Sequence, residues 1–160
     1  MHILWTTTCP STQLALLASK LLADLQAAPP PFSLWLSGPL GAGKTTLTAM
    51  LLRQLGLPQD EPVTSPTYTY MSEYEINGHW SAHLDLYRTR GAVSSEDLGL
   101  VDAHSFSGMF VEWPELCPDD PYLRPTHTLE IEFTHGGTER TYTLKDVAKA
   151  KVPERKAPGR

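Results

Sequence analysis

The sequence predicts an α/β fold: a mixed sheet that contains antiparallel hairpins and has helices on both faces. The first observation is the glycine-rich segment S-G-P-L-G-A-G-K-T-T at 37–46, which lies between an apolar run and a segment with apolar residues at helical spacing. The second is a pair of turn signals, Asn77-Gly78 and Gly136-Gly137, each between runs of β-forming residues. A strand–helix pattern therefore precedes an antiparallel one, which indicates a mixed sheet.

Two elements precede the glycine-rich segment. Residues 3–8 are apolar and threonine-rich and predict a first strand. The Pro-Ser-Thr sequence at 10–12 is typical of a helix start, and an apolar stripe at helical spacing follows it. The stripe consists of Leu14, Leu17, Ala18, Leu21, Leu22 and Leu25. Three prolines at 29–31 end this region, and the apolar run 32–36 predicts the next strand.

The spacing of Gly38, Gly43, Lys44 and Thr45 matches the phosphate-binding pattern G-x-x-x-x-G-K-[ST]. Glycines allow consecutive backbone amides to turn inward and form a concave set of donors for phosphate oxygens. In this pattern Lys44 reaches the β- and γ-phosphates, the Thr45 hydroxyl binds Mg²⁺, and the next helix directs its positive end at the anion. The segment predicts a P-loop NTPase-like fold; the alternative is a glycine-rich turn without a ligand.

The helix after this loop is predicted by apolar residues at helical spacing over 47–55 and ends at Gly56. The period of the apolar pattern then falls from about 3.6 residues to about 2. Residues 67–76 and 79–87 are β-rich and are joined by the Asn-Gly turn, the strongest short-range signal for a hairpin.

Three further elements complete the chain. Residues 94–104 predict a short acidic helix capped by Ser94 or Ser95. The apolar residues 109–111 predict a short buried strand that ends at an acid. Residues 129–133 and 140–144, joined through the Gly-Gly turn, predict a second hairpin.

Length and composition indicate one globular domain, which we place at residues 1–144. A chain of 160 residues with 41% hydrophobic content can bury a core of its own. Its N-terminal residues lack the features of a signal peptide, and no segment resembles a membrane span, so we expect a cytoplasmic protein without membrane contact. Cys9 and Cys117 lack metal-ligand spacing and are interpreted as buried, reduced thiols.

Charge is unevenly distributed along the chain. Residues 145–160 contain six Lys or Arg and two Asp or Glu, a net charge of +4; since the whole chain carries −5, residues 1–144 carry −9. An acidic body disfavours direct binding of nucleic acid, because affinity for phosphate backbones comes mainly from clustered Lys and Arg. The basic segment 145–160 is interpreted as a disordered, solvated tail, with contact to RNA or a partner as the alternative.

Two acids are candidates for the carboxylate that phosphate-loop enzymes place on a neighbouring strand. Glu112 ends an apolar strand, and its alternative interpretation is an ordinary strand-end carboxylate. Asp85 lies on the opposite face of its strand from Leu84 and Leu86, and its alternative is a salt bridge to Arg88. Either carboxylate could hold Mg²⁺ or its waters.

The hydroxyl residues of 64–67, Thr-Ser-Pro-Thr, follow the loop helix, where switch segments of phosphate-loop proteins sense the γ-phosphate. These hydroxyls could bond that phosphate or a metal-bound water, although Ser and Thr before a β-run need no ligand. His79 and His83 are interpreted as sheet residues, and Trp113 as a packing residue.

Five motifs, G-P-L-G-A-G-K-T-T, S-P-T-Y-T, H-L-D-L-Y-R, E-D-L-G-L and V-E-W-P, lie in this order between Ser37 and Pro114. Taken together they resemble the bacterial TsaE (YjeE) family. That family is a small ATPase in the biosynthesis of threonylcarbamoyladenosine on the transfer RNA base beside the anticodon. The resemblance covers about half of the chain and implies that ATP and Mg²⁺ are the cofactors.

The resemblance also implies roles for individual residues. The residues that it assigns to the phosphates of ATP are Gly38, Gly41, Ala42, Gly43, Lys44, Thr45 and Thr46. It implies that Thr45 and Glu112 bind Mg²⁺, with Asp85 beside them in the position of the catalytic acid. Lys44 completes the catalytic set.

More peripheral roles are implied for four other positions. Ser65 and Thr67 fall in the switch-like segment, Trp113 becomes a neighbour of the active site, and Ser11 contacts adenine by analogy. Pro39 departs from the family pattern, which usually has an acid there, and its missing N–H removes one possible phosphate donor.

The partners implied by the resemblance are the TsaB and TsaD proteins, of which TsaD transfers the threonylcarbamoyl group. The chain would be an accessory ATPase that drives this complex through its cycle and meets tRNA through the complex rather than directly. The sequence between the loop and Glu112 contains three arginines, Arg53, Arg88 and Arg90. We therefore expect slow hydrolysis until a partner supplies a further positive charge.

Two other functions stay open at this point. A P-loop small-molecule kinase would share the phosphate loop, although such kinases usually carry an arginine-rich lid and would phosphorylate an acceptor. A nucleotide-gated binding module would bind ATP and hardly hydrolyse it. Release of free phosphate without a phosphorylated product distinguishes the ATPase from both.

Overall fold

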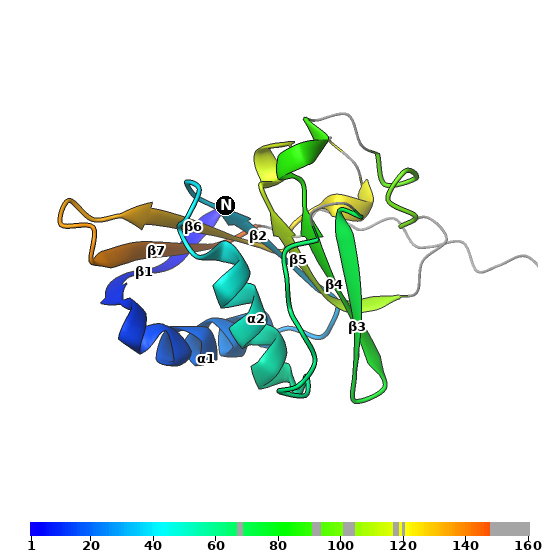
Figure 1. The fold of residues 1–160 in the computed structure, drawn as a ribbon, viewed down its shortest axis with the longest axis horizontal. Helices are drawn as coiled ribbons and strands as arrows, with labels where there is room; N and C mark the ends of the chain where they lie inside the picture. Colours follow the sequence, from blue (N-terminus) through cyan, green and yellow to red (C-terminus); the bar gives the residue numbers. More distant parts are fainter. Residues whose placement is uncertain (67–68, 91–93, 101–104, 117–118, 120, 148–160) are drawn as a thin grey trace, which may run out of the picture.

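The computed structural model describes residues 1–160 except 67–68, 91–93, 101–104, 117–118, 120 and 148–160 (Figure 1). Its strands are β1 (His2–Pro10), β2 (Phe32–Ser37), β3 (Met71–Ile76), β4 (His79–Asp85), β5 (Phe106–Glu112), β6 (His127–Phe133) and β7 (Glu139–Asp146). Its α-helices are α1 (Leu14–Leu25) and α2 (Lys44–Leu55). The 3₁₀-helices of the described part are η1 (Ser11–Gln13), η2 (Tyr87–Thr89), η3 (Pro114–Leu116) and η4 (Pro121–Leu123).

The strands form one seven-stranded sheet in the order β1-β7-β6-β2-β5-β4-β3. Strand β2 pairs in parallel with β5 and β6, and β4 pairs in parallel with β5. Strand β7 is antiparallel to both β1 and β6, and β3 is antiparallel to β4. The predicted mixed sheet with antiparallel hairpins is therefore confirmed, and the carboxyl ends of β1, β6, β2, β5 and β4 meet at one edge.

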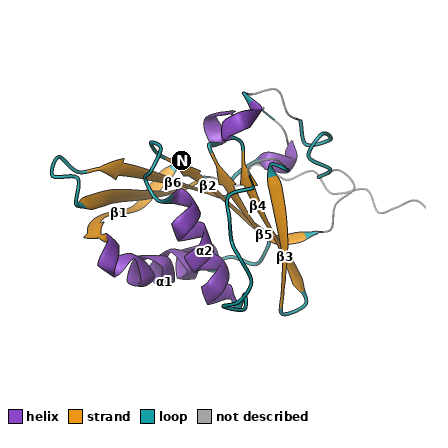
Figure 2. Cartoon of the chain, in the orientation of Figure 1, coloured by secondary structure: helices purple, strands orange, loops and turns teal. Residues whose placement is uncertain are grey.

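Both α-helices cover the same face of the sheet, side by side (Figure 2). All six residues of the predicted stripe of α1 are buried, and they join a core with Leu34 and Leu36 of β2 and Phe110 of β5. Each buried leucine contributes about 1.5–3 kcal/mol relative to an exposed one, so this stripe holds α1 to the sheet. On α2, Leu47 and Leu51 complete the same layer.

The opposite face of the sheet has shorter helical cover. Leu84 of β4 and Val111 of β5 are fully buried there, in a second core that includes Leu123 of η4. Leu116 of η3 packs against this core. The predicted helices on both faces are thus α-helices on one side and 3₁₀-helices on the other.

The prediction of an acidic helix over 94–104 is wrong for the described residues 94–100, in which 95–99 form consecutive turns and no helix. Ser94 does act as a cap, because its hydroxyl accepts from the Asp97 N–H (3.2 Å) and the Asp97 carboxylate accepts from the Ser94 N–H (2.9 Å). Gly99 then takes a left-handed φ of 71°, which ends the turn. Residues 101–104 lie outside the described residues.

Both predicted hairpins are confirmed. Asn77 and Gly78 have φ values of 51° and 79°, as a tight turn between β3 and β4 requires. Strand β3 starts at Met71, later than the predicted residue 67, and residues 67–68 lie outside the described part. The turn between β6 and β7 has Gly137 at φ 70°.

Strand β7 continues two residues beyond the predicted domain end at 144. Lys145 and Asp146 pair with residues of β6 and β1, and Lys145 Nζ lies 2.6 Å from Glu130 Oε1 in an ion pair. Val147 donates its backbone N–H to the Thr126 carbonyl at 2.9 Å, and residues 148–160 of the predicted tail lie outside the described residues.

Cys9 is buried and free, as expected, whereas Cys117 lies outside the described residues. No helix in the described ranges has the length and apolar character needed to cross a membrane.

Candidate functional site

The candidate residues gather at the edge where the parallel strands end. The glycine-rich loop joins β2 to α2, Glu112 ends β5, and Asp85 ends β4. In the sheet register Asp85 is the partner of Glu112, and Glu112 is the partner of Leu36 in β2. Ligands of open α/β sheets bind at this kind of edge, outside the carboxyl ends of the strands.

The loop has the backbone that its glycines predict. An added Cβ at Gly38 would lie 2.7 Å from the carbonyl oxygen of Ile131, so the chain can pass over the end of β6 only with glycine here. Gly43 caps α2 with φ 95°, in the left-handed region that L side chains rarely adopt. Because α2 starts at Lys44, the N–H groups of its first turn, which lack intrahelical acceptors, face the loop.

Lys44 folds back over this loop and is 5% exposed. Its Nζ donates to the carbonyl oxygens of Gly38 (2.6 Å) and Pro39 (3.1 Å), and it lies 4.0 Å from the centroid of the Trp113 ring. The ammonium therefore lies against the loop backbone, where phosphate oxygens could replace the two carbonyls as acceptors.

Burial lowers the pKa of Lys44, and the negative charges of Glu112, Glu115 and Asp85 oppose this shift. A buried ammonium gains from any added anion, because an opposite charge within a few ångströms favours the charged form. The electrostatics of the site therefore favour binding of an anion beside Lys44.

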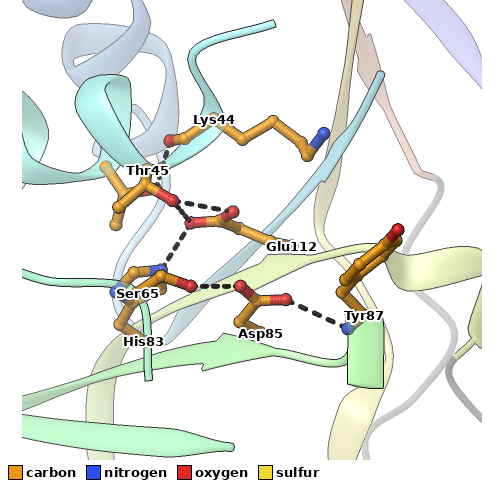
Figure 3. Close-up of polar contacts among 8 residues, drawn as sticks. Lys44, Thr45, Ser65, His83, Asp85, Tyr87 and Glu112 are labelled. Carbon is orange, nitrogen blue, oxygen red and sulfur yellow. Dashed lines mark hydrogen bonds and ion pairs between the residues drawn. The ribbon is translucent and has the colours of Figure 1, made fainter. Parts of the chain in front are cut away.

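Thr45 and His83 hold the Glu112 carboxylate (Figure 3). The Thr45 hydroxyl donates to Oε1 (2.8 Å) and Oε2 (3.0 Å) of Glu112, and His83 Nε2 donates to Oε1 (2.7 Å). Glu112 is 2% exposed and His83 is fully buried. Glu112 is thus a buried, hydrogen-bonded acid that links the sheet to α2.

Asp85 has different partners. Its Oδ2 accepts from the Ser65 hydroxyl, and its Oδ1 accepts from the Tyr87 backbone N–H (3.0 Å). The ion pairs between described residues are His83–Glu112 and Lys145–Glu130, so the expected alternative of a salt bridge from Asp85 to Arg88 is wrong. The Ser65 hydroxyl is thus hydrogen-bonded to the acid that ends β4. A Ser before a β-run needs no such partner.

Trp113 lies beside the loop as well as in the packing of the second core. It has a positive φ of 59°, and its ring contacts the Tyr87 ring with centroids 4.7 Å apart. With Lys44 over the face of its ring, Trp113 lies against the glycine-rich loop.

The remaining predicted residues lie at different distances from this centre. Ala42 is buried in the loop, Gly41 has φ 80°, and Thr46 is exposed in the first turn of α2. Ser11 is exposed in η1 directly after β1, at the same sheet edge but with β7 and β6 between β1 and β2. Thr67 lies outside the described residues.

Two residues at the site were not among the predicted site residues: His83, which was interpreted as a sheet residue, and Arg140. His83 is two positions before Asp85 on the same strand, so strand alternation places both on one face and could have identified it. Arg140 of β7 donates Nη2–H to the Gly41 carbonyl at 3.4 Å, and its guanidinium lies 5.1 Å from the Phe133 ring centroid. An arginine therefore does lie beside the loop, 99 residues away in sequence, where no local pattern indicates it.

The residues at this edge fit a Mg²⁺ ion that is held together with phosphates. Mg²⁺ usually takes one or two carboxylates, waters and substrate phosphates rather than an all-protein cage. The Thr45 hydroxyl and the Glu112 carboxylate are two such oxygen donors in direct contact, beside the glycine-rich loop. The described residues contain no group of three Asp, Glu, His or Cys that could hold a metal by itself.

Comparisons with known proteins agree on one family. The family model for "Threonylcarbamoyl adenosine biosynthesis protein TsaE" matches residues 10–142. The "tRNA threonylcarbamoyladenosine biosynthesis protein TsaE" of Bacillus subtilis is 37% identical over 133 residues, 81% of this chain and 80% of that protein. The protein of the same description from Haemophilus influenzae is 42% identical over 82 residues, 51% of each chain, so the match spans about half of that relative.

A solved structure has the same arrangement of elements. The crystal structure of YdiB from Bacillus subtilis superimposes with a TM-score of 0.61 at 26% sequence identity. The match covers 92% of this chain and 89% of YdiB.

Proposed function

The chain belongs to the TsaE family of threonylcarbamoyl adenosine biosynthesis proteins, and from this premise we propose that it is an ATPase that assists formation of threonylcarbamoyladenosine on tRNA in the cytoplasm. The observation that carries the proposal is the direct contact of Thr45 with Glu112 at the loop that holds Lys44. A lysine for phosphates and an oxygen pair for Mg²⁺ thus occupy one site.

In this proposal ATP binds through the loop. Its phosphates take the place of the Gly38 and Pro39 carbonyls as partners of Lys44 Nζ, and accept from the first N–H groups of α2. Thr45 and Glu112 hold Mg²⁺, which neutralises charge that develops on the phosphate oxygens during transfer.

Asp85 is the proposed base for the attacking water. It ends the strand beside Glu112 and is only half-buried, so a water can reach its carboxylate. The oxygen of the water would attack the γ-phosphorus while Asp85 accepts a proton from that water. ADP would be the leaving group, with its phosphates still bound by Lys44 and the first N–H groups of α2. Lys44 stays on the β- and γ-phosphates throughout.

The proposed partners are the TsaB and TsaD proteins, with tRNA reached through them. The net charge of −9 on residues 1–144 supports a protein–protein role rather than direct binding of RNA. Exposed apolar side chains lie in or next to elements of the nucleotide edge: Leu40 in the loop, Tyr87 in η2 and Phe133 at the end of β6. Such a surface suits coverage by a partner.

One experiment tests the proposal. Purified protein is given ATP and Mg²⁺, and released phosphate is measured alone, with a TsaB–TsaD assembly, and with the assembly plus tRNA. We expect slow release alone and faster release with the assembly. A phosphorylated small molecule in place of free phosphate would identify a kinase, and ATP binding without release in any mixture would identify a binding module.

A further inference from the structure

We propose that His83 is a positioning residue, which holds the Glu112 carboxylate in the orientation that Mg²⁺ binding needs. The inference rests on the proposed function, because it concerns the metal of the same site. His83 is fully buried and donates from Nε2 to Glu112 Oε1 at 2.7 Å.

The two contacts on Glu112 come from different layers of the fold. Thr45 approaches from the first turn of α2, and His83 approaches from β4, which lies next to β5 in the sheet. A carboxylate with one anchor can rotate about its last side-chain torsion, whereas two anchors from rigid elements prevent this rotation. Since Thr45 is itself an expected metal ligand, His83 is the anchor that stays independent of the metal.

The position of His83 is costly for the fold alone. Its neighbours Ala82 and Leu84 are fully buried apolar residues, as an interior strand favours. His83 Nδ1 is buried and has no hydrogen-bond partner within the described part of the chain, and such an unpaired polar atom lowers stability. A leucine would fill this place without the unpaired atom. The feature that histidine provides and leucine lacks is the hydrogen bond to Glu112.

Residues that orient a metal ligand affect metal binding more than they affect the rest of the ligand. Loss of such a partner typically costs about 10–100-fold in metal affinity or activity. For this chain the effect would appear in the Mg²⁺ dependence of nucleotide binding, while binding of ADP without metal, which uses the loop and Lys44, would be unchanged.

The test is calorimetric titration of ADP into the full chain, first in EDTA and then over a range of Mg²⁺ concentrations. The variants are His83→Leu, which removes the donor, and His79→Leu, a matched control on the exposed far end of the same strand. We expect His83→Leu to raise the half-saturating Mg²⁺ concentration about 10–100-fold, with ADP affinity in EDTA as in the wild type. His79→Leu should leave both quantities unchanged.

A second pair of variants keeps the test decisive if His83→Leu does not fold. The amide nitrogen of His83→Gln can reach the place of Nε2, whereas that of His83→Asn is too short to do so. A positioning role predicts that His83→Gln has nearly the wild-type Mg²⁺ dependence and His83→Asn does not.

Three results would overturn the inference. One is a wild-type Mg²⁺ dependence in His83→Leu; another is an equal Mg²⁺ dependence in the Gln and Asn variants. The third is an equal loss of ADP affinity with and without metal, which would assign His83 to the fold alone. If instead the wild-type chain binds no ADP, the proposed function itself fails, which distinguishes the two failures.

Discussion

Glu112 and Asp85 are partners in the sheet register, yet the structure holds them in different ways. Glu112 is 2% exposed and accepts hydrogen bonds from Thr45 of α2 and His83 of the neighbouring strand β4. Asp85 is half-buried and is bonded by Ser65, from the segment between α2 and β3, and by the backbone of Tyr87 in η2. One acid is held by long regular elements, and the other is held by connecting segments.

The difference supports the different roles that we propose for the two acids. A group that binds a metal gains from being held rigidly, because preorganisation avoids reordering when the ion arrives. A group that acts on a water has to be reachable from solvent, and connecting segments are the parts of a fold that most easily change on ligand binding. Glu112 thus suits the metal, and Asp85 suits the chemical step and its coupling to the segment of Ser65.

The largest expected effect comes from Lys44→Ala, since the charge of Lys44 acts with both acids. Loss of one charged phosphate partner should weaken ATP binding about 10–100-fold and slow hydrolysis about 1000-fold. Lys20→Ala, on the exposed surface of α1, is the matched control and should change neither. Titration of ATP and assay of released phosphate measure both effects; wild-type values for Lys44→Ala would contradict the phosphate-loop assignment.

Asp85→Asn should have the second largest effect on hydrolysis, because it removes the proposed base and preserves the shape of the side chain. We expect ATP affinity to be retained and hydrolysis to fall about 100-fold, the lower part of the range for a general base. Raising the Mg²⁺ concentration should not restore the rate. Asp60→Asn, an exposed position, serves as control. Full activity in Asp85→Asn would limit Asp85 to its hydrogen bonds with Ser65 and Tyr87.

Glu112→Gln distinguishes the two acids. Its loss of hydrolysis rate should depend on the Mg²⁺ concentration, whereas that of Asp85→Asn should not. Removing one ligand charge should lower the hydrolysis rate about 10–100-fold at limiting Mg²⁺, with partial recovery at high Mg²⁺. ADP binding in EDTA should be little changed. Glu115→Gln removes a nearby charge that acts on Lys44 without contacting Thr45 and is the matched control. A rate that is insensitive to Mg²⁺ would count against the metal role.

Ser65→Ala should have the smallest effect, because it changes a contact of Asp85 and leaves the hydrogen bonds of Glu112 intact. It removes one hydrogen bond to the Asp85 carboxylate, which at about 0.5–1.5 kcal/mol corresponds to a roughly two- to tenfold slower hydrolysis. Mg²⁺ dependence should stay as in the wild type. A shift in Mg²⁺ dependence would mean that the two acids act as one unit, and the proposed division between them would be wrong.

Much of the fold could be predicted from the sequence because its signals are local. The apolar stripe of α1, the loop glycines and the Asn-Gly turn each depend on residues a few positions apart, and helical or strand periods are visible at that range. The acidic helix over 94–104 failed for a local reason too, since the left-handed Gly99 ends the turn that Ser94 starts. The start of β3 was placed too early, at 67 instead of Met71, because β-forming residues do not mark where pairing begins.

The sequence by itself determined the glycine-rich loop between a strand and a helix, the lysine at the start of that helix, and the acid that ends the strand before Trp113, since each follows from a local pattern. The strand of Asp85 was predicted over 79–87, and the structure ends it at Asp85. Only the tertiary structure decided which side chains meet them. His83 reaches Glu112 across 29 residues, Ser65 reaches Asp85 across 20, and Arg140 reaches Gly41 across 99. Strand order and register set these meetings, and both depend on long-range pairing of whole strands that no short stretch of sequence specifies.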